Sequence, residues 1–142
     1  MDGGAWEGFL AESALFGALS DEVRQALAER LVPRSIEGGE LVISEGEEAD
    51  GLYLVVAGRL QARRGDGDET VVLGEIGRGE VFGEAALLTD RPRVATVVAL
   101  RDSELLHLPT DAFEALIAEH PALLRPVTTQ VVDRMVAAGR GP

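Results

Sequence analysis

The sequence predicts a mainly β protein with flanking helices, folded as an antiparallel β-sandwich. Residues 5–31 and 110–138 carry apolar side chains at the spacing of amphipathic helices. Residues 32–109 consist instead of short β-branched runs separated by glycines. Strands segregated from helices in this way are typical of antiparallel sheets with helices at their ends. The 142 residues, 1–142, are enough for a single domain with its own core.

The N-terminal helical region has two parts. The stretch "WEGFLAESALF" places Trp6, Phe9 and Leu10 at spacings of three and four. Ser20 is a candidate N-cap, because acidic residues follow it where the helix dipole favours negative charge. We expect this second helix to continue through "SDEVRQALAERL" and to end at Pro33.

The middle region contains the predicted strands. The runs "ELVIS", "GLYLVVAG", "GRLQARR", "TVVLGEI" and "EVFGE" are short, rich in β-branched residues and bounded by glycine. Such runs are typical of the strands of a sandwich or barrel. The polar stretch "RRGDGDET" is the best candidate for a hairpin tip.

The C-terminal helical region begins after Pro109, where Thr110 is a candidate N-cap and Phe113 and Leu116 form an inner face. Pro126 interrupts the apolar pattern that follows. An interior proline costs a helix about 3 kcal/mol. We therefore expect two short helices or a bend at this point.

Composition excludes several kinds of function. The chain has no cysteine, which removes disulfides, thiolate catalysis and cysteine metal sites. Its two histidines, His107 and His120, are not at ligand spacing, so we expect no metal and no cofactor. The net charge of −12 argues against a nucleic-acid partner. No apolar run is long enough to span a membrane, no signal peptide is evident, and the default expectation is a cytoplasmic location.

The stretch "FGEAALLTDRPRVATVVAL", residues 82–100, combines a glycine, an acid and a base around small side chains. The guanidinium of Arg93 can pair with a phosphate through two N–H groups. A helical turn after Gly83 would offer free backbone N–H groups to the same anion. Glu84 would repel a phosphate but can accept a hydrogen bond from a hydroxyl, such as a ribose 2′-OH. Together these residues predict a site for a molecule that carries both phosphate and ribose.

A plainer interpretation of the same residues is that Glu84 and Arg93 form a salt bridge with each other on the surface. Most charged side chains are solvated, and most ion pairs are structural. The residue chemistry alone leaves both interpretations open.

The stretch resembles the phosphate-binding cassette of the cyclic nucleotide-binding domain family, F-G-E-x-A-L-L-x-x-x-P-R-x-A-T-V. It matches that pattern without an insertion from Phe82 to Val97. A second match is "VISEGEEADGLYLVVAG", residues 42–58, which resembles the family's early-strand signature. The flanking stretches "LFGALSDE" and "DSELLHLPTDAFEALIAEHP" also resemble family members, so the likeness covers roughly residues 10–134.

The resemblance implies a jelly-roll sandwich, of the cupin-like double-stranded β-helix type, that binds cyclic AMP or cyclic GMP. It implies that Glu84 accepts from the ribose 2′-hydroxyl and that Arg93 pairs with the cyclic phosphate. Backbone N–H groups of the cassette would complete the phosphate cradle. The implied ligand-binding residues are Gly83, Glu84, Ala85, Ala86, Arg93 and Val94.

The resemblance also bears on the purine. In the family, Thr or Ser directly after the arginine favours cyclic GMP, whereas this chain has Val94, so cyclic AMP is the expected ligand. One wall of the base pocket is expected from apolar strand residues, and a lid is expected from the C-terminal helix. The candidates are Val71, Leu73, Val81 and Phe82 for the wall and Val132 and Met135 for the lid.

The leading hypothesis is therefore a regulatory module that senses a cyclic nucleotide and is not an enzyme. It would relay binding through its C-terminal helices to an effector that is another chain or a domain absent from this one. The alternatives are a degenerate module that binds no ligand, and a metal-dependent cupin-type enzyme. The sequence leaves the oligomeric state open.

The other polar candidates are weaker. His107 alternates with leucines and is expected to point from a strand to solvent. Glu45, Glu47, Glu48 and Asp50 form an acidic turn, which is expected to be a solvated loop. A calcium site is the alternative, but the turn lacks the regular spacing of oxygen ligands.

Overall fold

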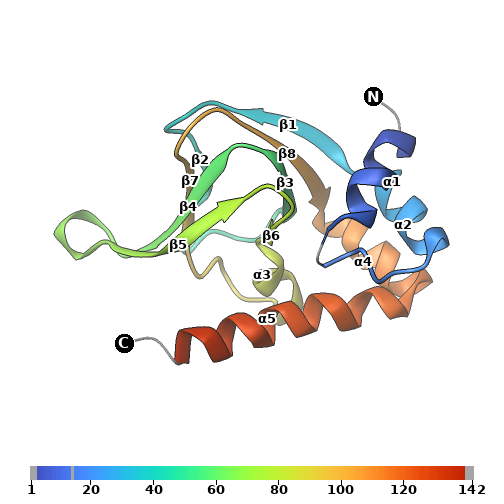
Figure 1. Cartoon of the computed structure of the whole chain (residues 1–142). Helices are drawn as coiled ribbons and strands as arrows, with labels where there is room; N and C mark the ends of the chain where they lie inside the picture. The colour runs from blue at the N-terminus through green and yellow to red at the C-terminus, as the bar shows by residue number, and fades with distance from the viewer. Residues whose placement is uncertain (1–2, 14, 140–142) are drawn as a thin grey trace.

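The structure is a computed structural model that describes residues 3–13 and 15–139 (Figure 1). Its helices and strands follow in the order α1 (Gly3–Ala11), α2 (Asp21–Ala28), β1 (Val32–Ile36), β2 (Leu41–Ile43), β3 (Gly51–Ala57), β4 (Arg59–Arg64), η1 (Gly67–Glu69), β5 (Val71–Gly77), β6 (Val81–Phe82), α3 (Glu84–Thr89), β7 (Thr96–Ala99), β8 (Ser103–Pro109), α4 (Thr110–Glu119), η2 (Pro121–Leu123) and α5 (Leu124–Gly139).

The strands form two four-stranded antiparallel sheets. One sheet has the order β1-β8-β3-β6, and the other has the order β2-β7-β4-β5. The predicted mainly β class with antiparallel strands is therefore confirmed, and the polar tip predicted at "RRGDGDET" joins the paired strands β4 and β5. The finer description as a cupin-like double-stranded β-helix stays a prediction.

Side-chain alternation along β3 connects two hydrophobic clusters. Leu52 and Leu54 belong to a cluster shared with the helices, whereas Tyr53 and Val55 belong to a cluster between the two sheets. All four side chains are at most 1% exposed. Successive strand residues point to opposite faces, so β3 anchors the helices on one side and the second sheet on the other.

The helices occupy one end and one side of the sandwich. In Figure 1, α1, α2 and α4 gather at one end, and α5 runs from there past α3. Ser20 is the N-cap of α2 as predicted, since its side chain accepts from the backbone N–H of Val23 at 3.3 Å. Val127 of α5 is fully buried in the helix-facing cluster, which fixes the rotation of this helix.

The break expected at Pro126 is wrong. The chain is helical without interruption from Leu124 to Gly139, and Pro126 is the third residue of that helix. Proline is tolerated in the first turn, because the N–H groups there have no intrahelical acceptor in any case. The actual change of direction comes earlier, at the short 3₁₀ turn η2, which follows His120.

Candidate functional site

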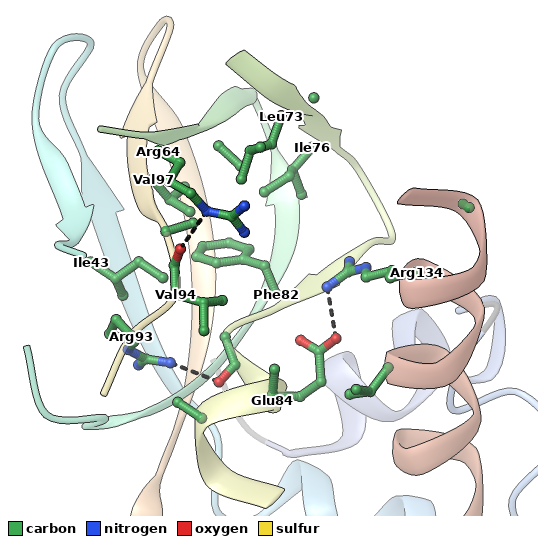
Figure 2. Close-up of a pocket in the computed structure, with 18 residues that line it drawn as sticks. Ile43, Arg64, Leu73, Ile76, Phe82, Glu84, Arg93, Val94, Val97 and Arg134 are labelled. Atoms are coloured by element: carbon green, nitrogen blue, oxygen red, sulfur yellow. Dashed lines mark hydrogen bonds and ion pairs between the residues drawn. The ribbon is translucent and has the colours of Figure 1, made fainter. Parts of the chain in front are cut away.

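A cavity of about 670 Å³ lies where the sheet containing β4 and β5 meets the β6–α3 segment and α5 (Figure 2). All six predicted ligand-binding residues line it, together with apolar side chains from both sides of the sandwich. Its lining consists of Ile43, Ala62, Arg64, Leu73, Gly74, Ile76, Phe82, Gly83, Glu84, Ala85, Ala86, Arg93, Val94, Ala95, Val97, Val131, Arg134 and Ala137.

Gly83 allows the chain to turn from β6 into α3 next to Arg93. Its φ is +88°, a left-handed conformation that side chains with a Cβ rarely adopt. A Cβ at this position would lie 2.9 Å from Nη1 of Arg93. The turn therefore needs glycine, and it brings the first N–H groups of α3 to the cavity, where they have no acceptor within the helix.

Arg93 is buried, with only 4% of its surface exposed. Its Nη1 donates to the carbonyl of Gly83 at 2.7 Å (Figure 2), and its Nη2 donates to the carbonyl of Gly51 at 2.7 Å. Nη2 also donates to Oδ1 of Asp50 at 2.8 Å, which makes an ion pair. A guanidinium has five N–H groups, so these three bonds leave two for a ligand.

Asp50 is held on both sides. Its Oδ2 accepts from the hydroxyl of Tyr53 at 2.9 Å, while Oδ1 accepts from Arg93. Partial burial alone would raise the pKa of Asp50, but the bonds from Tyr53 and Arg93 outweigh it and lower that pKa. Burial and the neighbouring carboxylate raise the pKa of Tyr53 to about 12. Asp50 is therefore an anionic partner of Arg93 at neutral pH, although it lies in an exposed loop, as predicted for the acidic turn.

Glu84 is 1% exposed and carries an incomplete set of hydrogen bonds. Its Oε1 accepts from Nη1 of Arg134 at 2.7 Å and from Nε2 of Gln130 at 2.9 Å. Its Oε2 is buried and has no partner among the described residues. An unpaired buried carboxylate oxygen is costly, so this oxygen is the acceptor that a ligand hydroxyl would fit.

The plain salt-bridge interpretation of Glu84 and Arg93 is wrong. Among the described residues, Arg93 pairs with Asp50 and Glu84 pairs with Arg134. Figure 2 shows the two bonded to different partners within one cavity. The arrangement separates a buried cation from a buried anion and leaves donors on one and an acceptor on the other.

Two of the four predicted wall residues line the cavity and two do not. Leu73 and Phe82 line the cavity, whereas Val81 is fully buried in the helix-facing cluster on the opposite side of β6. Val71 is 58% exposed at the start of the edge strand β5 and does not line the cavity. Adjacent strand residues point to opposite faces, so Val81 and Phe82 cannot both face the cavity. Val71 and Val81 are therefore wrong as wall residues.

Of the two predicted lid residues, Val132 lies on the wrong face of α5. Val132 is 49% exposed and does not line the cavity, and the side chain of Met135 lies outside the described part of the structure. Val131 and Arg134 face the cavity instead. They lie four and seven residues after the buried Val127, on the same helical face.

Three polar residues near the site were missed by the sequence analysis: Asp50, Gln130 and Arg134. Gln130 and Arg134 are four residues apart on a helix, which places them on one face. Besides Glu84, both side chains donate to the main-chain carbonyl of Val81, Gln130 at 3.2 Å. These bonds tie α5 to the segment that lines the cavity.

His107 is also placed differently from the prediction. Its ring is half-buried and stacks on Tyr53 with 4.5 Å between ring centroids, and its Nε2 lies 3.0 Å from the backbone oxygen of Asp50. Burial lowers the pKa of His107, against the opposing effect of Asp50. Within residues 3–13 and 15–139, no group of three or more histidine, cysteine or carboxylate side chains is placed to hold a metal ion. No described helix is both long enough and apolar enough to cross a membrane.

Comparison with known proteins identifies relatives of this chain. It is 37% identical to the cAMP-dependent protein kinase type II regulatory subunit of Drosophila melanogaster, over 79% of this chain and 30% of that protein. It is 30% identical to the lysophospholipase NTE1 of Candida glabrata, over 83% of this chain and 9% of that protein. The chain therefore spans only a small part of the length of these relatives.

Solved structures with a similar fold were also found. The regulatory domain of Toxoplasma gondii PKA, crystallised with cAMP, superposes with a TM-score of 0.73 at 32% identity, over 80% of this chain and 44% of that one. The catabolite activator protein of Thermus thermophilus superposes with a TM-score of 0.77 at 30% identity, over 92% and 60% of the two chains.

The family described as "Cyclic nucleotide-binding domain" matches residues 33–120, which is more than half of the chain and includes Gly83, Glu84 and Arg93. The chain belongs to the cyclic nucleotide-binding domain family.

Proposed function

We propose that this chain senses a cyclic nucleotide in the cavity between the sandwich and α5, with cyclic AMP preferred over cyclic GMP. The observation that carries the proposal is the pair of open hydrogen-bonding positions on Glu84 and Arg93. Oε2 of Glu84 is a buried acceptor without a partner, and Arg93 has two N–H groups left over. A cyclic nucleotide offers the matching groups, a ribose hydroxyl and an anionic phosphate.

The remaining lining fits the rest of such a ligand. Backbone N–H groups from the first turn of α3 would add donors to the phosphate, and the small side chains of Ala85 and Ala86 leave room for it. Leu73, Ile76 and Phe82 form an apolar wall that suits a purine ring. The match to the cyclic nucleotide-binding domain family favours a binding module over the cupin-type enzyme.

The preference for cyclic AMP rests on Val94. This side chain lines the cavity and is 53% exposed at its mouth. It carries no hydroxyl that could bond to the polar edge of guanine, whereas family members with Thr or Ser at this position favour cyclic GMP.

Relay of binding is proposed to run through α5. Arg134 and Gln130 join this helix to Glu84 and to the carbonyl of Val81, so a ligand that bonds to Glu84 acts on the same carboxylate as α5. A ligand shifts an equilibrium by its different affinity for the two states. The effector is proposed to be a partner chain or a domain outside this sequence, and a cytoplasmic location stays a prediction.

The first prediction tests binding itself. Cyclic AMP should raise the melting temperature, because a ligand that binds only the folded state adds about 2.7 kcal/mol of stability at a hundredfold excess over Kd. The measurement is a thermal shift with calorimetric titration against cyclic AMP and cyclic GMP. If millimolar nucleotide produced no thermal shift and no heat of binding, the proposal would be contradicted and the non-binding interaction module would be favoured.

The second prediction separates the roles of Arg93 and Glu84. Arg93→Ala should weaken cyclic AMP binding by well over tenfold, since losing one side of a desolvated charge pair costs about 2–5 kcal/mol. Glu84→Ala should cost less, about 1.5–3 kcal/mol. It should hardly affect binding of 2′-deoxy cyclic AMP, which lacks the hydroxyl.

Because both side chains are buried, the melting temperature of each variant must be measured beside its affinity. Arg30→Met is a matched control, since Arg30 pairs with Glu119 on the surface away from the cavity. Equal losses of the ribose and deoxyribose ligands in Glu84→Ala would rule out the proposed role of Glu84.

The third prediction concerns the purine. Val94→Thr should improve cyclic GMP binding relative to cyclic AMP by about 0.5–1.5 kcal/mol, the net value of one hydrogen bond. Val94→Ala is the control, because it shortens the side chain without adding a hydroxyl. A wild-type protein that prefers cyclic GMP would show that Val94 does not set the choice.

The fourth prediction concerns the relay. Cyclic AMP should slow amide hydrogen exchange along Leu124–Gly139, and Gln130→Met should reduce this response because it removes the bonds from Nε2 to Glu84 and Val81. Thr128→Met, at an exposed position of the same helix, should leave the response intact. Exchange in α5 that is equal with and without the ligand would argue against the relay.

A further inference from the structure

A directed chain of hydrogen bonds leads from the outer strand β1 to Arg93 in the cavity. Nη1 of Arg34 donates to the hydroxyl oxygen of Tyr53 at 2.9 Å, and that hydroxyl donates to Oδ2 of Asp50 at 2.9 Å. Oδ1 of Asp50 then accepts from Nη2 of Arg93 at 2.8 Å. The chain crosses three neighbouring strands of one sheet, because β1 pairs with β8 and β8 pairs with β3 (Figure 1).

The chemistry of the groups fixes the direction of this chain. A guanidinium can only donate, so the hydroxyl of Tyr53 must accept from Arg34 and send its own proton to Asp50. The carboxylate of Asp50 then has one oxygen engaged by Tyr53 and the other by Arg93. Held at both oxygens, the carboxylate cannot turn freely, although its side chain is 57% exposed.

The ring of Tyr53 supports the cavity from a second direction. It is fully buried and stacks between Phe82, at 5.2 Å between centroids, and His107, at 4.5 Å. Phe82 lines the cavity and directly precedes Gly83, whose carbonyl accepts from Arg93. One side chain thus contacts both the residue that holds Arg93 and the segment that presents Gly83.

We propose that Tyr53 and Arg34 are positioning residues for the ligand site, which fix the direction of the Arg93 guanidinium by acting through Asp50. This inference rests on the function proposed above. Three of the five N–H groups of Arg93 are already bonded, so the other two meet a phosphate only while the guanidinium keeps its orientation. Neither Tyr53 nor Arg34 lines the cavity, so any effect on affinity must pass through other residues.

The test is a set of affinities for cyclic AMP. Tyr53→Phe keeps the stacked ring and removes only the hydroxyl, and it should weaken binding about threefold to tenfold. Arg34→Met, at a half-buried surface position, should weaken binding by a smaller factor in the same direction. Arg30→Met removes an arginine of another surface ion pair and should leave affinity unchanged.

A double-mutant cycle distinguishes positioning from packing. If Tyr53 acts through Asp50, the variant with both Tyr53→Phe and Asp50→Asn should bind no more weakly than Asp50→Asn alone. Losses that add together, or unchanged affinity in both Tyr53→Phe and Arg34→Met, would overturn the proposal. Should Tyr53→Phe fail to fold, Arg34→Met combined with Asp50→Asn gives the same cycle.

A measurement without ligand keeps this inference separate from the proposed function. In the free protein, the Nη–H signals of Arg93 in a proton–nitrogen spectrum should be resolved, because Nη1 and Nη2 both donate to protein oxygens, and their exchange with water should be faster in Tyr53→Phe and in Arg34→Met. Unchanged exchange in both variants would overturn the positioning role even if cyclic AMP binds. A wild-type protein that shows this behaviour but binds no cyclic nucleotide would defeat the proposed function alone.

Discussion

The structure of the cavity depends on keeping two buried charges apart. Arg93 and Glu84 are 4% and 1% exposed and line the same cavity, where a direct ion pair would satisfy both. Each is balanced instead by a partner that reaches solvent, Asp50 for Arg93 and Arg134 for Glu84. A buried charge without compensation would be strongly unfavourable, so these outer partners make it possible to bury both. The sides of Arg93 and Glu84 that remain unbonded are what a ligand can use.

This separation dictates where the backbone must run. The start of β3 has to approach Arg93 closely enough for the carbonyl of Gly51 to accept from it. A Cβ at Gly51 would lie 2.2 Å from the carbonyl oxygen of Leu108, so only glycine fits at this point, where β3 pairs with β8. The other half of the arrangement requires α5 to lie against β6 and α3, because Arg134 must reach Glu84. Charge balance at the cavity and the docking of the last helix are therefore one structural requirement.

The sequence predicted those parts of the site that are local. The cassette residues follow one another within one turn and one short helix, so their spacing carries their geometry. The partners of the two charges are not local: Asp50 and Arg93 are 43 residues apart, and Glu84 and Arg134 are 50 apart. No spacing rule selects one acidic residue among the 25 in this chain as the partner of Arg93.

The wall and lid residues, in contrast, follow from local geometry. Strand alternation forbids Val81 and Phe82 from facing the same cavity. Counting in helical steps from an inward-facing Val127 would have selected Val131 and Arg134 in place of Val132. The cost of Pro126 depends on its distance from the helix start, which the apolar pattern alone did not locate. Both the kind of element and its phase are therefore needed to place a side chain.

The charges of the site also explain why orientation matters more here than net potential. Arg93 and Arg134 are paired with Asp50 and Glu84, and the whole chain carries −12, so little net positive charge gathers at the cavity. Arg64 adds one cation at the rim, where its Nε lies 3.4 Å from the carbonyl of Val94. Under the proposed function, recognition of the phosphate would then depend on hydrogen bonds at short range, whose strength falls steeply with misalignment. Such recognition requires a guanidinium held in one direction, as Asp50 and two carbonyls hold Arg93. Under the same proposal, Tyr53 and Arg34 would affect phosphate binding because they hold Asp50.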